Sequence, residues 1–183
     1  KDGDEYLDVT DALEMAAAAG IDRIMQIGVD VESSRWSVEA AHQYPNVLAT
    51  VALHPNEAPR IFADHGQSGL DAAIAEIDRL ASDARVRGIG ETGMDYFRTT
   101  SEGLAAQEES FRRHIEIAKR HGKALVIHDR DAHEDVVRVL LDAGAPDKVV
   151  FHCFSGDHWL ASVAKEHGWY CSFSGTVTFK NSH

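Results

Sequence analysis

The sequence is poor in residues that would mark it as disulfide-stapled, secreted or membrane-bound. Of its 183 residues, only two are cysteine and four are proline. Cys153 and Cys171 lie in or beside apolar runs, so we expect two buried, reduced thiols. No apolar run approaches the roughly 18 residues of a membrane span, and the acidic N-terminus lacks the basic start of a secretory signal. These absences predict a cytoplasmic protein without a membrane anchor.

Basic residues are also scarce. Lysine and arginine number 18 against 30 aspartates and glutamates, giving a formal net charge of −12. This balance argues against a broad basic surface that grips duplex DNA. It does not exclude a nucleic-acid substrate, because bound divalent cations can supply positive charge next to a phosphate. We therefore expect an acidic protein that acts on phosphates to depend on metal.

What is present is a regular alternation of helix and strand patterns. Strict β-α alternation demands parallel strands joined by right-handed crossovers. Residues 57–69 are the one irregular insertion and are expected to form a surface loop. The predicted helices cover residues 4–19, 33–44, 69–83, 101–122, 131–144 and 156–168, and the predicted strands cover 21–30, 46–55, 86–93, 123–129, 148–154 and 169–175.

Six strands do not close an eight-stranded barrel, so two α/β architectures remain open. One is a doubly wound sheet, and the other is a TIM-type (β/α)8 barrel that lacks its first and last strands. A doubly wound sheet commonly has a glycine-rich phosphate loop after its first strand, and residues 28–33 (GVDVES) offer none. We therefore predict one partial barrel domain over residues 1–183, a length and a hydrophobic content of 44% that can bury a single core.

Three apolar runs each end on a residue that can ligate a metal, namely Glu91, His128 and His152. Parallel strands bring their C-terminal ends to one rim, where barrel enzymes do their chemistry. A single buried histidine could simply bond to a backbone carbonyl, but two histidines and a carboxylate on separate strands indicate a catalytic metal site. Mixed nitrogen and oxygen ligation suits zinc or manganese better than magnesium. A carboxylate such as Glu91 can also bridge two ions, as in two-metal phosphoester hydrolysis.

Further polar residues are expected at the same rim. His54 ends another strand and is predicted to contact substrate or phosphate, with a purely structural histidine as the alternative. Arg98 could hold a phosphate as a bidentate fork, and Asp95 could orient a ligand or a water molecule. A surface salt bridge is the alternative for Arg98 and Asp95. The other histidines, including His114, lie among polar neighbours and are expected to have no role, although His133 falls close to the rim.

These motifs together resemble the TatD family of metal-dependent deoxyribonucleases. The resemblance covers nearly the whole chain, in the right order and spacing. It implies a TIM-barrel hydrolase that cleaves phosphodiesters of single-stranded or frayed DNA, from a 3′ end, with two divalent ions (Zn, Mn or Mg). It also implies that Glu91 bridges the ions and that His128 and His152 complete the ligands of the second ion. The motifs are ALHPNEA (52–58), GIGETGMDYFR (88–98), ALVIHDRDAHEDVVRVL (124–140) and VVFHCFSGD (149–157).

The sequence departs from the family pattern in three places. No H-x-H pair opens the chain, no aspartate follows Gly175, and Asn56 replaces the second histidine of an HPH motif. The first two fall at the ends, as truncation would produce. Two alternatives therefore stay open: a related barrel hydrolase acting on amides, lactones or esters, and a truncated scaffold without turnover. Relatives of the first kind often bridge their metals with a carbamylated lysine, so Glu91 favours phosphoesters.

Overall fold

The computed structural model describes residues 8–180 and has the predicted alternation of helices and strands. Each of the first five strands is followed by a helix that returns the chain to the start of the next strand. The helices are α1 (Val9–Ala18), α2 (Val31–Gln43), α3 (Glu57–Ala81), α4 (Leu104–His121), α5 (His133–Ala143) and α6 (His158–His167). The strands are β1 (Ile24–Ile27), β2 (Val47–Val51), β3 (Val86–Asp95), β4 (Ala124–Arg130), β5 (Val149–Phe151) and β6 (Tyr170–Cys171), and two 3-10 turns are η1 (Ser101–Gly103) and η2 (Gly175–Thr178).

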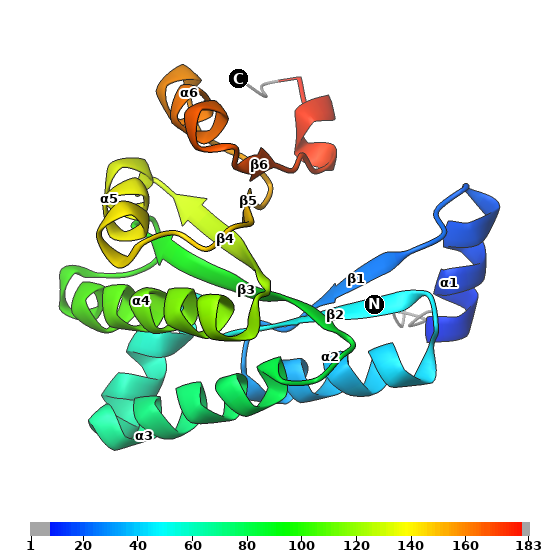
Figure 1. Cartoon of the computed structure of the whole chain (residues 1–183), viewed down its shortest axis with the longest axis horizontal. Coiled ribbons are helices and arrows are strands. Elements are labelled where there is room, and N and C mark those ends of the chain that lie inside the picture. Colours follow the sequence, from blue (N-terminus) through cyan, green and yellow to red (C-terminus); the bar gives the residue numbers. More distant parts are fainter. Residues whose placement is uncertain (1–7, 181–183) are drawn as a thin grey trace, which may run out of the picture.

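The six strands form one parallel sheet in the order β1-β2-β3-β4-β5-β6. This order never reverses, whereas a doubly wound sheet changes direction at a switch point. The sheet curves, and α2, α3, α4 and α5 follow its outer side (Figure 1). The sheet is therefore a curled half-barrel, as predicted, and all of its strands end toward the same rim.

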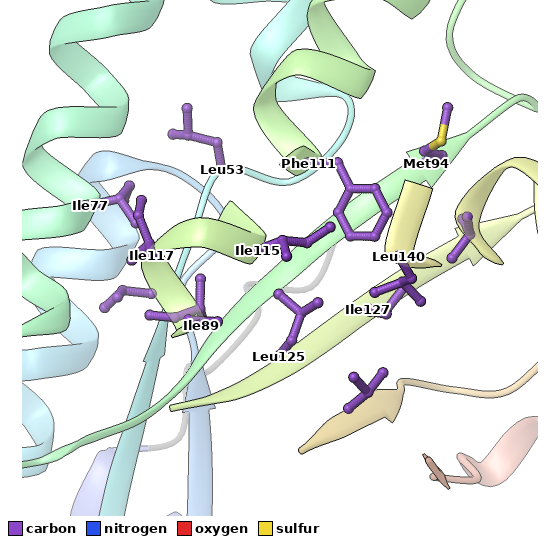
Figure 2. Packing of buried hydrophobic residues seen from close by; sticks show 14 of the residues in the cluster. Leu53, Ile77, Ile89, Met94, Phe111, Ile115, Ile117, Leu125, Ile127 and Leu140 are labelled. Carbon is purple, nitrogen blue, oxygen red and sulfur yellow. The ribbon is translucent and has the colours of Figure 1, made fainter. Parts of the chain in front are cut away.

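The core lies between the sheet and the helices that cover its outer side. Phe111 and Ile115 project from α4 toward Ile89 of β3 and toward Leu125 and Ile127 of β4 (Figure 2). All five side chains are fully buried. Each fully buried side chain of this size contributes about 1.5–3 kcal/mol through the hydrophobic effect. This packing fixes β3 and β4, the two strands that carry Glu91 and His128, relative to each other.

The prediction of a surface loop at residues 57–69 is wrong, because this segment forms the first half of α3. Pro59 occupies the first turn, where a helix needs no backbone N–H. Helical φ/ψ angles are interrupted at Gly66 (φ 64°, ψ −167°), so α3 consists of two helical runs joined at a kink. Ala58 is fully buried and anchors the first run against the core.

The two cysteines are free thiols, as expected, but the expectation of burial is wrong for Cys153. Strand β5 ends at Phe151, three residues earlier than the predicted strand. Cys153 therefore lies in the following turn, with a positive φ of 47°, and its side chain is exposed. Cys171 is partly buried in β6, and its burial raises the pKa of the thiol. Within residues 8–180, no helix has both the length and the apolar character needed to cross a membrane.

Candidate metal centre

Three side chains that can ligate a metal converge at the C-terminal rim of the half-barrel. They are His54, which follows β2, Glu91 of β3 and His128 of β4. One donor atom from each lies within 4.8 Å of the other two. The structure thus groups the predicted ligands Glu91 and His128 with His54, which the sequence indicated as a substrate contact.

The imidazole of His128 lies between two carboxylates. Its Nδ1 is 2.7 Å from Oε1 of Glu91, and its Nε2 is 3.1 Å from Oδ2 of Asp95. Burial alone would lower the pKa of His128, but the two carboxylates outweigh it and the pKa is raised. Burial likewise opposes ionisation of Glu91, yet the hydrogen bond and charge of His128 keep its pKa below the ordinary value. A positive charge is therefore stabilised where these three groups meet.

His54 completes the cluster from the segment that follows β2. Its Nε2 is 3.2 Å from Nδ1 of His128, and the two rings meet edge to face with centroids 4.4 Å apart. The backbone N–H of Asn56 contacts Nδ1 of His54 at 3.2 Å and holds the ring in this orientation. Burial, followed by the neighbouring charge of His128, lowers the pKa of His54. The imidazole is thus kept neutral, the form that binds metal ions.

Asp95 links the cluster to the chain around it. Its carboxyl is only 1% exposed, and besides His128 it accepts hydrogen bonds from the side chain of Asn56 (3.3 Å) and the backbone N–H of Arg98 (2.8 Å). Burial raises its pKa, but these hydrogen bonds and His128 more than offset that effect and the pKa is lowered. Asp95 therefore stays ionised and restrains the ring of His128.

Gln107 is a buried residue at this site that sequence reasoning missed. Its Oε1 accepts the backbone N–H of Asp95 (3.0 Å), and its Nε2 donates to the carbonyl of Pro55 (3.1 Å) and to Oγ1 of Thr99 (2.8 Å). It thus joins the loop after β2 to the end of β3. The spacing in the sequence could have revealed it. Gln107 lies four residues before Phe111, on the apolar stripe of α4, and a polar side chain buried there needs a hydrogen-bond partner.

His114 is the second buried polar residue of α4, and its predicted polar surroundings are wrong. The ring is fully buried, with Nδ1 2.7 Å from the carbonyl of Ser110 and Nε2 accepting the backbone N–H of Leu53 at 3.0 Å. A neutral ring with its proton on Nδ1 satisfies both contacts. His114 therefore supports the backbone just before His54.

Stability should fall in acid because of His114. Burial lowers the pKa of His114 from 6.5 to about 4. The unfolded chain therefore takes up this proton first, and as pH falls from 6.5 to 4 the folded state loses about 3 kcal/mol of stability through this group. His114→Gln keeps an acceptor for Leu53 and cannot titrate. Urea unfolding of both proteins should show the wild type losing about 3 kcal/mol relative to the variant between pH 7 and pH 4; a constant difference would contradict a neutral buried imidazole.

His152, the third predicted ligand, lies outside the cluster. Its Nε2 is 3.2 Å from Sγ of Cys153, and its Nδ1 is 3.5 Å from Oγ of Ser172. It is close enough for its charge to help lower the pKa of Glu91. His133 was predicted to fall close to the same rim. Its Nδ1 is 2.7 Å from Oδ2 of Asp129, where β4 leads into α5.

Arg98, the predicted phosphate contact, is exposed. Among residues 8–180 its guanidinium forms no ion pair, although its positive charge contributes to lowering the pKa of His54. Beside it lies a cavity of about 450 Å³. The residues that line this cavity are Asn56, Pro59, Arg60, Arg98, Thr99, Thr100 and Gly103.

The donor set of the cluster fits a divalent cation. Two imidazoles and one carboxylate are a known ligand set for catalytic zinc, and the same mixture suits manganese. The side chains of Glu91 and His128 are only 16% and 19% exposed, so water screens their charges weakly. A divalent ion held by His54, Glu91 and His128 would replace a proton on His128 as the positive charge that faces the carboxylates of Glu91 and Asp95.

Comparison with known families decides the assignment. The profile of the family described as TatD related DNase matches residues 2–183. The chain belongs to the TatD family. Proteins similar to it include TatD of Mycobacterium tuberculosis, 43% identical over 178 residues, and YabD of Bacillus subtilis, 33% identical over 176 residues, and both are named uncharacterized metal-dependent hydrolases. The alignments cover 95% and 96% of this chain but 64% and 66% of the two relatives, so the chain spans slightly less than two thirds of their length.

Solved structures of TatD proteins have the same fold. The TatD homologue YjjV of Escherichia coli K12 superposes with a TM-score of 0.82 at 24% identity, over 94% of this chain and 64% of that one. A TatD family hydrolase of Entamoeba histolytica gives a TM-score of 0.75 at 21% identity, over 94% of this chain and 59% of that one. The predicted family and the predicted barrel architecture, represented here by a half-barrel, are confirmed.

Proposed function

We propose that this chain carries part of the metal centre of a deoxyribonuclease that hydrolyses phosphodiester bonds of single-stranded or frayed DNA from a 3′ end. The observation that carries the proposal is the His54–Glu91–His128 cluster, which collects two imidazoles and a carboxylate at the rim of parallel strands. The description of the TatD family supports the choice of substrate.

Each residue at the rim has a task in this proposal. His54, Glu91 and His128 hold a divalent ion, and Glu91 or residues such as His152 can help to hold a second. Such ions stabilise charge on phosphoryl oxygens and make water a stronger acid. Asp95 fixes the ring of His128 through the 3.1 Å contact and so keeps the ligand geometry in place.

Binding of the DNA backbone is assigned to the basic side of the rim. Arg98 has no ion-pair partner within the described residues, and the adjoining cavity is also lined by Arg60, which pairs with Glu57. A guanidinium binds a phosphate through two parallel hydrogen bonds. A protein nucleophile is not needed, and Ser155 is an unsuitable one because its hydroxyl donates to the carbonyl of Asp129 (3.1 Å).

The test is hydrolysis of a single-stranded oligonucleotide with added Mn²⁺, Mg²⁺ or Zn²⁺. We expect shortening from the 3′ end that EDTA reduces by at least about 100-fold, because metal ions supply several kcal/mol of transition-state stabilisation. Amide, lactone and simple ester substrates should be hydrolysed far more slowly. Metal-dependent hydrolysis of such a compound without any cleavage of DNA would contradict the proposal and favour the related barrel hydrolases.

We also propose a cytoplasmic location. Cys153 and Cys171 are free thiols, which supports a reducing compartment.

A further inference from the structure

We propose that the exposed ring of Phe97, backed by the guanidinium of Arg130, is a stacking platform for a nucleobase of single-stranded DNA next to the metal centre. This inference rests on the proposed function and extends it from the phosphodiester to the base. It assigns a ligand to two residues that have no part in the metal cluster.

The geometry of the pair points to a stacking surface. Phe97 lies in the turn that follows β3 and is 63% exposed. The central carbon of the Arg130 guanidinium is 3.8 Å from the centroid of its ring. At this distance the cation is attracted to the ring and restrains it. The guanidinium lies over the ring, and 63% of Phe97 nevertheless remains exposed, which leaves aromatic surface on which a base can stack.

The position of Arg130 brings this surface to the metal centre. Side chains alternate along a strand, so His128 and Arg130 lie on the same face of β4. Two residues span about 7 Å along a strand. The backbone N–H of Tyr96 donates to the carbonyl of Arg130 (2.9 Å), which ties the turn of Phe97 to the end of β4. A base on Phe97 would therefore belong to a nucleotide whose phosphate lies near the cluster.

Exposure alone does not distinguish Phe97, because Trp36, Phe62 and Trp159 are also at least 43% exposed, and scattered exposed apolar residues are normal. What distinguishes Phe97 is a stacked cation at the rim. Arg130 forms no ion pair within residues 8–180, so its charge remains available to DNA in a protein whose net charge is −12.

This surface selects single strands. A base in a duplex is already stacked and paired, and extracting it costs several kcal/mol. Aromatic side chains stack on any base because every base has a π-face, so the contact tolerates all sequences. We therefore expect a preference for unpaired DNA without a strong sequence preference.

The experiment compares binding of two single strands of equal length by fluorescence anisotropy, one with bases and one abasic. Both carry phosphorothioate linkages that slow hydrolysis, and divalent metal is present. Phe97→Ala should weaken binding of the base-containing strand by about 5- to 150-fold, the effect of losing one base–aromatic stack. It should leave the affinity for the abasic strand unchanged. Phe97→Trp should retain the wild-type preference, and Phe62→Ala, which removes an exposed phenylalanine from α3, should behave as wild type.

Three results overturn the inference: equal affinity of the wild type for the two strands, an equal loss for both strands in Phe97→Ala, or no loss for either strand in Phe97→Ala. Its failure can be told apart from failure of the proposed function, because cleavage of unmodified DNA is measured separately. Base-dependent binding that Phe97→Ala removes supports the platform even if the wild type cleaves no DNA. Cleavage by the wild type with no effect of Phe97→Ala on binding rejects the platform alone.

Discussion

Glu91→Gln should weaken binding of Zn²⁺ or Mn²⁺ by more than about 100-fold. Loss of a residue that merely orients a ligand lowers metal affinity by about 10- to 100-fold, and Glu91 is proposed as a ligand itself. The substitution removes the one carboxylate of the cluster and a charge that is largely shielded from water, since its side chain is 16% exposed. Isothermal titration calorimetry with each metal measures the affinity, and DNA cleavage should fall in parallel.

Glu116→Gln is the matched control, because it makes the same chemical change at an exposed position of α4, where Glu116 pairs with Lys119. Its metal affinity should equal that of the wild type. Circular dichroism should show that both variants are folded. Metal affinity that Glu91→Gln leaves intact would reject Glu91 as a ligand and, with it, the proposed centre.

Gly93→Ala should destabilise the protein by about 3 kcal/mol or more. A Cβ atom at Gly93 would lie 2.0 Å from the carbonyl oxygen of His128, and φ is +142°, which favours glycine. The obstacle is backbone, so β3 and β4 must separate, and overpacking of this kind costs about 1–3 kcal/mol in addition to the backbone strain. For a chain of this size we expect the melting temperature to fall by about 6–12 °C. Metal affinity should fall too, because Glu91 and His128 lie on the two strands that move apart.

Gly122→Ala separates the cost of backbone strain from the cost of steric overlap between β3 and β4. Gly122 ends α4 with φ +60°, and a Cβ atom there would meet nothing within 4 Å. Backbone strain alone should cost about 1–2 kcal/mol at this position and leave metal binding unchanged. If differential scanning calorimetry gave the same melting temperature for both alanine variants, the close approach of β3 and β4 at Gly93 would be refuted.

The orientations of the side chains at the site could not be predicted from the local sequence pattern. The sequence predicted that Glu91, His128 and His54 share a rim, because each follows an apolar strand. It did not predict that His54 faces Nδ1 of His128 at 3.2 Å while the ring of His152 turns toward Cys153 and Ser172. Such orientations depend on the curvature of the sheet and on the register shift between β3 and β4 beside Glu91, both of which arise only when the strands pair.

The amino-acid sequence by itself determined the parallel α/β order and the candidate ligands Glu91 and His128. Both follow from the spacing of apolar residues, which alternates between helical and strand patterns along the chain and can be recognised within each segment. The tertiary structure alone decided that α3 begins at Glu57 and that Phe97 meets Arg130. It also decided that His114 supports the backbone before His54 and that Gln107 supports the backbone after it. The reason is physical. Hydrogen bonds and stacking between distant segments depend on how the helices pack on a curved sheet. The spacing of residues within one segment carries no information about how far that segment lies from another in the folded chain.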